Sequence, residues 1–94
     1  MKTYKVEDAD YWAFIVANNT HEAQKLYLKE VAEPEDLREL SVSELTEKVL
    51  TTYMVSKYSD TDSGFVLDIM TLQDFVKTGP QNKPWTAIVC ADLL

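Results

Sequence analysis

Residues 11–17 read YWAFIVA and residues 85–91 read WTAIVCA, and these two stretches are the clearest structural signals in the sequence. Each is a short, continuous apolar run that is rich in aromatic and β-branched residues. Runs of this length and composition are typical of buried strands. Because the two runs are so alike in character, we predict that they are neighbours at the centre of a sheet. Residues 3–6 are predicted to form an edge strand or an arm.

A helix is predicted directly after the first run, over residues 20–32. Asn19 or Thr20 is the expected N-cap, and Glu22 lies three residues after Asn19, where a capping box places its acid. Apolar residues recur at helical spacing along this segment, which indicates one buried helix face. Pro34 is expected to end the helix, because a proline disfavours the helical conformation at the residue before it.

The stretch from residue 33 to residue 50 predicts two short elements. Residues 37–42 are compatible with a short edge strand. Ser43 has the character of an N-cap, and the apolar residues that follow predict a helix over residues 43–50.

Residues 51–58 and 65–70 are both rich in strand-forming residues and predict a β-hairpin. The sequence between them is dense in turn formers, and Gly64 is free to take a positive φ. A rival interpretation continues the preceding helix to about Ser56, with its apolar residues on one face. The β-branched residues in this stretch favour the strand.

A last helix is predicted over residues 71–78, with Thr71 and Asp74 as a capping-box-like start and Gly79-Pro80 as its end. The predicted fold class is therefore α+β, with one domain over residues 1–94. Its small mixed or antiparallel sheet has strands near residues 11–17, 51–58, 65–70 and 85–91, and helices near residues 20–32, 43–50 and 71–78 pack on it.

The charge of the chain is its strongest compositional feature. Sixteen Asp and Glu residues face nine Lys and Arg residues, which gives a net charge of −7. A domain of this sign repels nucleic acid and anionic membranes and attracts basic protein surfaces. Cys90 is the only cysteine, and the sequence contains neither a signal peptide nor an apolar run long enough to span a membrane. These features predict a protein of the reducing bacterial cytoplasm.

Catalytic and metal-binding chemistry finds little support in the sequence. His21 is the only histidine, and Cys90 lies inside an apolar strand, so we expect neither a Cys–His pair nor a zinc site. The spacing of Asp60, Asp62 and Gly64 differs from that of a calcium loop, because glycine stands where the third ligand belongs. We therefore expect a protein that is not an enzyme and that holds no cofactor.

The acidic residues concentrate in one segment. Residues 30–47, which we call the acidic segment, hold seven acids and the single base Arg38, a charge of −6 over eighteen residues. Such a segment can lie on the basic groove of a partner in place of nucleic-acid phosphates, because complementary charge speeds encounter and sets register. The predicted partner-binding residues are Glu30, Glu33, Glu35, Asp36, Glu39, Glu44 and Glu47.

The stretch FIVANNTHEAQKLYLKEV, the acidic residues after it and the closing PWTAIVCA resemble small proteins of Gram-positive bacteria and their phages. In composition and layout, the whole chain also resembles small acidic phage and mobile-element proteins of the anti-CRISPR type. That resemblance implies a stoichiometric inhibitor that occupies the nucleic-acid-binding surface of a host nuclease. It rests on no diagnostic motif, so it assigns no functional residue.

A second hypothesis is a regulatory or structural domain without an inhibitory role. Such a domain would form a homodimer through a sheet edge or an apolar helix face. The sequence leaves both hypotheses open, and the oligomeric state separates them.

Overall fold

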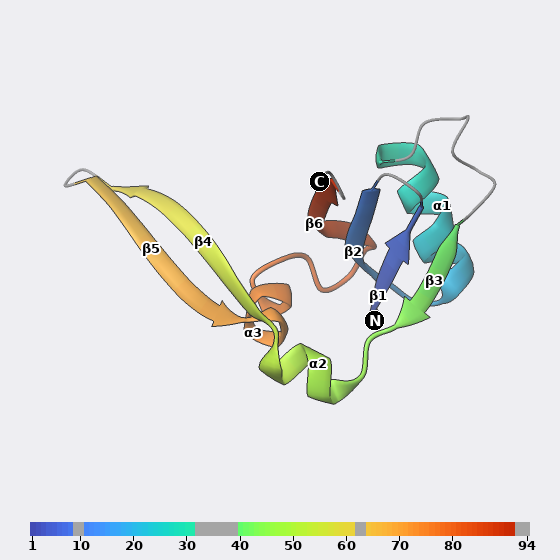
Figure 1. Ribbon diagram of the computed structural model, residues 1–94, viewed down its shortest axis with the longest axis horizontal. Coiled ribbons are helices and arrows are strands. Elements are labelled where there is room, and N and C mark those ends of the chain that lie inside the picture. Colours follow the sequence, from blue (N-terminus) through green and yellow to red (C-terminus); the bar gives the residue numbers. More distant parts are fainter. Residues whose placement is uncertain (9–10, 32–39, 62–63, 92–94) are drawn as a thin grey trace. The chain divides into compact units, whose positions relative to one another are not determined.

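The computed structural model describes residues 1–8, 11–31, 40–61 and 64–91. These residues form six strands and three helices (Figure 1). In chain order they are β1 (Lys2–Glu7), β2 (Tyr11–Ala17), α1 (Thr20–Glu30), β3 (Ser41–Glu44), α2 (Glu47–Thr52), β4 (Met54–Thr61), β5 (Gly64–Thr71), α3 (Leu72–Lys77) and β6 (Trp85–Ala91).

The predicted α+β class is confirmed, and the strands divide between two sheets. The chain groups into two compact units, of which unit 1 comprises residues 1–45 and 80–94, and unit 2 comprises residues 46–79. Unit 1 holds a four-stranded sheet and unit 2 a two-stranded one. The sequence had predicted all strands in one sheet, because alternation of side chains identifies a strand and not its neighbours. A single domain stays a prediction.

The sheet of unit 1 has the strand order β3-β1-β2-β6, and every neighbouring pair is antiparallel. The predicted pairing of the two apolar runs is confirmed, since Trp12 in β2 lies opposite Cys90 in β6. Their position differs from the prediction in one respect, because β6 is an outer strand and β1 and β2 are the inner pair. The stretch predicted as an edge strand or arm is thus β1, an inner strand.

Helix α1 begins at the predicted cap. The side chain of Asn19 accepts a hydrogen bond from the backbone N–H of Glu22 at 2.8 Å. The Glu22 carboxylate reaches back to Asn18, accepting from its backbone N–H at 3.2 Å and from its side-chain amide at 3.1 Å. These bonds satisfy backbone groups that a helix start otherwise leaves unpaired.

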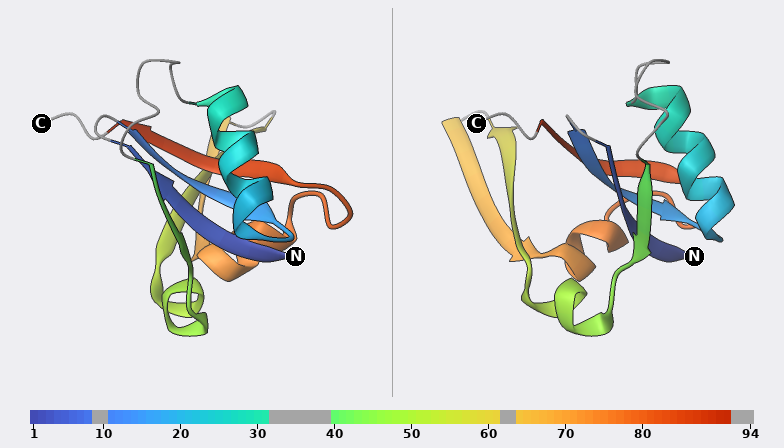
Figure 2. Two further views of the ribbon diagram at one scale, coloured as in Figure 1. Left: turned by 90° about the vertical axis from the view of Figure 1, so that its right-hand side faces the viewer. Right: turned by 45° about the vertical axis from the view of Figure 1, so that its right-hand side comes forward.

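One face of the four-stranded sheet is covered by α1 (Figure 2). Ala23 and Tyr27 project from the helix and are fully buried. Their neighbours in the core come from alternate positions of β1 and β2, because side chains two residues apart share a sheet face. Those neighbours are Tyr4, Val6, Ala13, Ile15 and Ala17.

Tyr27 also ties the helix to the turn between β1 and β2. Its hydroxyl donates to a pair of acceptors, Asp8 Oδ2 at 2.7 Å and the carbonyl oxygen of Tyr11 at 3.0 Å. Asp8 Oδ1 accepts from the backbone N–H of Tyr11 at 2.8 Å, which links the residue after β1 to the first residue of β2. A buried hydroxyl needs such partners, and here they fix the helix against one particular turn.

The second face of the sheet is aromatic. Trp12 and Phe14 share it with a ring-centroid separation of 4.8 Å, and Lys5 Nζ lies 5.2 Å from the Trp12 ring. Register places Trp85, opposite Val16, on the same face. The indole N–H of Trp85 is buried and has no acceptor among the described residues.

Unit 2 begins with α2, which lies later in the chain than predicted. The helix predicted over residues 43–50 runs instead from Glu47 to Thr52, and Thr46 is its N-cap. Ser43, the predicted cap, lies in β3 opposite Lys5. Both residues have the side chain that a cap requires, and the pairing of β3 with β1 decides between them.

The predicted hairpin is confirmed as β4 and β5, which pair in continuous antiparallel register from Met54 opposite Thr71 to Thr61 opposite Gly64. Gly64 has a φ of 125°, in agreement with the expectation that this glycine can take a positive φ. Strand β4 starts three residues later than predicted, and the rival helix to Ser56 is wrong beyond Thr52.

Helix α3 confirms the third predicted helix and its cap. The Thr71 hydroxyl accepts from the backbone N–H of Asp74 at 3.2 Å. Leu72 is the fully buried residue of this helix. Across the described residues, no helix combines the length and the apolar character that crossing a membrane requires.

Candidate functional site

The structure divides the acidic segment and does not gather its seven predicted binding residues into one site. Three of them, Glu30, Glu44 and Glu47, belong to described elements, and all three are exposed. Glu30 and Glu44 lie in unit 1 and Glu47 lies in unit 2. The other four lie outside the described residues: Glu33, Glu35, Asp36 and Glu39.

Glu30 is the last residue of α1 and is held in place by the sheet. Its Oε2 accepts a hydrogen bond from the hydroxyl of Thr86 in β6, at 2.7 Å. The pair joins residues that are 56 positions apart in the chain. The acidic segment therefore starts at a point that is fixed on the face of the sheet that α1 covers.

Glu44 ends β3 and is partly neutralised. Its Oε1 lies 3.0 Å from Lys2 Nζ at the start of β1. The hydrogen bond and the charge of Glu44 raise the pKa of Lys2 above its ordinary value of 10.5. The pair is exposed, so its contribution to stability is small. Its importance is electrostatic, because a partner that approaches Glu44 also meets a cation.

Glu47 stands in the first turn of α2. The Thr46 hydroxyl caps this helix by accepting from the backbone N–H of Val49 at 3.3 Å. A carboxylate in the first turn interacts favourably with the positive end of the helix dipole. This charge therefore has a local structural role in addition to the predicted binding role.

The single histidine and the single cysteine belong to different elements. His21 is exposed in the first turn of α1, and Cys90 belongs to β6, opposite Trp12. Among the described residues, no group of three His, Cys, Asp or Glu side chains is placed to hold a metal ion. Asp60 and Gly64 belong to the two strands of the hairpin.

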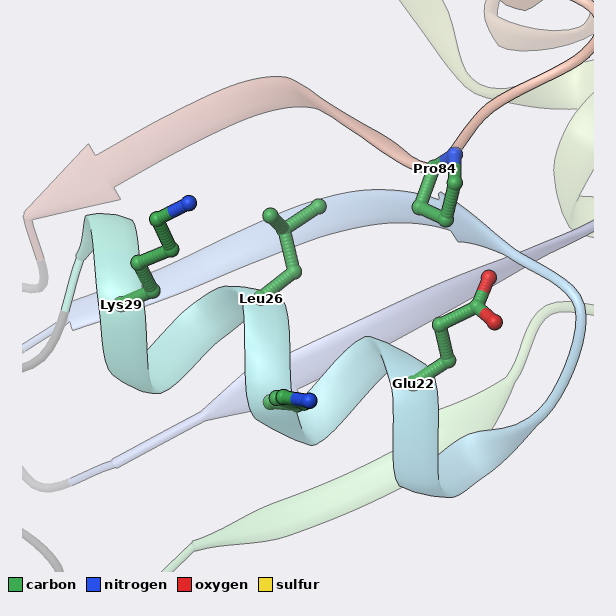
Figure 3. Close-up of a pocket in the computed structure, with 5 residues that line it drawn as sticks. Glu22, Leu26, Lys29 and Pro84 are labelled. Carbon is green, nitrogen blue, oxygen red and sulfur yellow. The ribbon is translucent and has the colours of Figure 1, made fainter.

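Unit 1 has a shallow groove, with a volume of about 190 Å³, that the sequence did not predict. Leu26 and Pro84 supply apolar lining, while Lys25, Lys29 and Glu22 bring charged groups to it (Figure 3). The helix residues recur three and four positions apart, so they form one stripe on α1. The helical spacing of these residues is visible in the sequence, but only the fold sets Pro84, the residue before β6, beside them.

Comparison with known proteins places the chain in a family. The model of the YosH C-terminal domain matches residues 1–83, which span β1 to α3. Strand β6 lies beyond the matched residues. No curated protein matches the chain, and no solved structure matches it. Because the match covers most of its length, the chain belongs to the YosH C-terminal domain family.

Proposed function

We propose that this domain is a non-enzymatic binding protein whose acidic segment docks on a basic protein surface. The observation that carries the proposal is the charge distribution. The acidic segment holds −6 of the net charge of −7, with Arg38 as its single cation. Concentrated charge of one sign steers association with a surface of the opposite sign and fixes the register of the complex.

Two described acids of the acidic segment support this use. Glu30 and Glu44 are both exposed in unit 1, and their contacts hold each carboxylate in a defined place. Fixed charges lose less side-chain entropy on binding than freely rotating ones. Lys2 offsets Glu44, and four of the seven acids of the segment lie between Glu30 and Glu44 in the sequence.

A narrower form of the proposal names the partner. In this form the domain is an inhibitor of the anti-CRISPR type, and its acidic segment occupies the surface on which a host nuclease binds nucleic acid. Its support is the resemblance in composition and layout. A nuclease-protection assay tests it, because an inhibitor of this kind competes with DNA and loses potency as the DNA concentration rises.

The broader proposal is tested by neutralising the same number of acids at two different places in the chain. One variant replaces four acids of the segment by their amides, and a control replaces four acids of unit 2 in the same way. Both variants change the net charge from −7 to −3. The test variant carries Glu33→Gln, Glu35→Gln, Asp36→Asn and Glu39→Gln, and the control carries Asp60→Asn, Asp62→Asn, Asp68→Asn and Asp74→Asn.

The measurement is affinity capture from a bacterial lysate at about 50 and 300 mM salt, a range over which surface charge is screened to different degrees. We expect the unmodified chain and the control to retain a basic protein at low salt and to release it at high salt. The segment variant should lose it. Equal capture by all three chains, or capture that does not depend on salt, would show that the acidic segment is not the contact surface.

A further inference from the structure

Strand β6 is one of the two outer strands of the four-stranded sheet. Among the described strands its neighbour is β2, and no second strand pairs with it. An outer strand presents a row of backbone N–H and C=O groups that the sheet itself leaves unpaired. The edge of β6 is therefore a place where another strand can add to the sheet.

The two outer strands differ in how well they resist such addition. Strand β3 has four residues, SVSE, and Glu44 at its end is paired with Lys2. Short length and charge are the usual protection of a sheet edge. Strand β6 has seven residues, WTAIVCA, with no charged residue and no proline among them. Val89 of this strand is 53% exposed, so one of its apolar side chains contacts solvent.

The occupant is indicated by the strand that β6 already binds. β2 reads YWAFIVA and pairs with β6 in antiparallel register. The composition of β6 is nearly the same as that of β2. The β6 strand of a second copy would therefore offer the outer edge of β6 a strand of the same kind as β2. Two copies that share one edge around a two-fold axis necessarily run antiparallel, which is also the direction of the pairing with β2.

We propose that the outer edge of β6 pairs with the same edge of a second copy, so that two four-stranded sheets join into one. This inference does not depend on the proposed function, because it uses neither the acidic segment nor its partner. The strand lies beyond residues 1–83, which the family model matches.

Salt separates this interface from the acidic one. Each copy carries a net charge of −7, while β6 carries none. Two copies therefore repel each other over a distance but meet through neutral strands, so screening by salt should strengthen the dimer. Binding of the acidic segment to a basic surface should weaken with salt. The two interactions respond to ionic strength in opposite directions.

The test compares two exposed β-branched residues that are changed in the same way. Val89→Lys places a cation beside the β6 edge, and two-fold symmetry places a second one near it. Ile69→Lys is the matched control, since Ile69 is 64% exposed on β5 of unit 2 and the change in net charge is identical. Sedimentation equilibrium of the full chain between about 10 μM and 1 mM measures the dimer dissociation constant.

We expect the unmodified chain and Ile69→Lys to dimerise alike, and Val89→Lys to raise the dissociation constant by at least about tenfold. Amide hydrogen exchange of the unmodified chain gives a second measurement, in which the amides of β6 gain protection as the concentration rises. A monomer throughout this range overturns the proposal. A dimer that Val89→Lys does not weaken more than Ile69→Lys also overturns it. In the lysate capture, Val89→Lys should behave as the unmodified chain does, so failure of either proposal is visible without the other.

Discussion

Different interactions stabilise the inside of each of the two units. Unit 1 contains nearly all the fully buried apolar side chains of the described residues, in β1, β2 and α1. Among the side chains that the structure describes, unit 2 contributes one, Leu72, and this unit also has a hairpin ladder and two capped short helices. Apolar burial is the largest stabilising contribution in a domain, whereas ladders and caps act locally. We therefore expect the effects of a substitution to spread through unit 1 but to stay local in unit 2.

The largest effect is expected from Ile15→Ala. Ile15 is fully buried in β2 beneath α1, and the change opens a cavity that should lower the free energy of unfolding by about 3 kcal/mol. Ile69→Ala is the matched control, because Ile69 is 64% exposed and its loss should cost less than about 0.5 kcal/mol. Urea denaturation followed by circular dichroism measures both. Equal losses would remove the basis of the comparison.

Tyr27→Phe should have the next largest effect. It keeps the buried ring and removes the hydroxyl that donates to Asp8 and the Tyr11 carbonyl, so we expect a loss of about 1–2 kcal/mol. A double-mutant cycle with Asp8→Asn checks the cause. The double variant should be less destabilised than the sum of the single variants, because the partners share one bond. Strict additivity would mean that the hydroxyl acts through other contacts.

Thr46→Ala probes unit 2. It removes the side chain that caps α2, with an expected cost of about 1 kcal/mol to local stability, and Thr46→Ser should restore most of it. Amide hydrogen exchange is the appropriate measurement, because it resolves local opening from global unfolding. The amides of α2 should exchange faster while those of β1 and β2 are unchanged. Faster exchange in both units would show that the two units open together.

The smallest effect on stability is expected from Lys2→Gln. Its raised pKa means that the pair with Glu44 contributes fully below pH 10.5 and is lost as the pH rises through the higher folded value. The pair is exposed, so the thermal midpoint at pH 7 should not change measurably. Binding offers the sharper measurement. The net charge changes from −7 to −8 and Glu44 loses its cation, so a basic partner should be retained to higher salt.

Local sequence signals predicted most of the elements. The N-caps Asn19 and Thr71, the hairpin and its glycine, and the mutual pairing of the two apolar runs are all present in the structure. Each depends on residues that lie close together in the chain or on composition, which is why a sequence reveals them. The prediction of α2 was less accurate, because Ser43 and Thr46 are equally good caps and only the pairing of β3 with β1 separates them.

The candidate site was predictable in charge but not in geometry. The sequence identified the acidic segment, yet it could not show that Thr86 holds Glu30 or that Lys2 offsets Glu44. In both contacts the two residues are far apart in the sequence, so no local sequence pattern predicts the contact. The same holds for Pro84, which reaches the α1 groove because β6 lies beside β2.

The amino-acid sequence was enough to predict the α+β class, the positions of most strands and helices, and the concentration of negative charge between residues 30 and 47. The tertiary structure was needed to show that β1 is an inner strand, that the hairpin forms its own sheet, and that β6, paired with β2, is an outer strand among the described strands. The physical reason is that side-chain alternation and capping act over a few residues. Strand order is set by which apolar faces can be buried together across the whole chain.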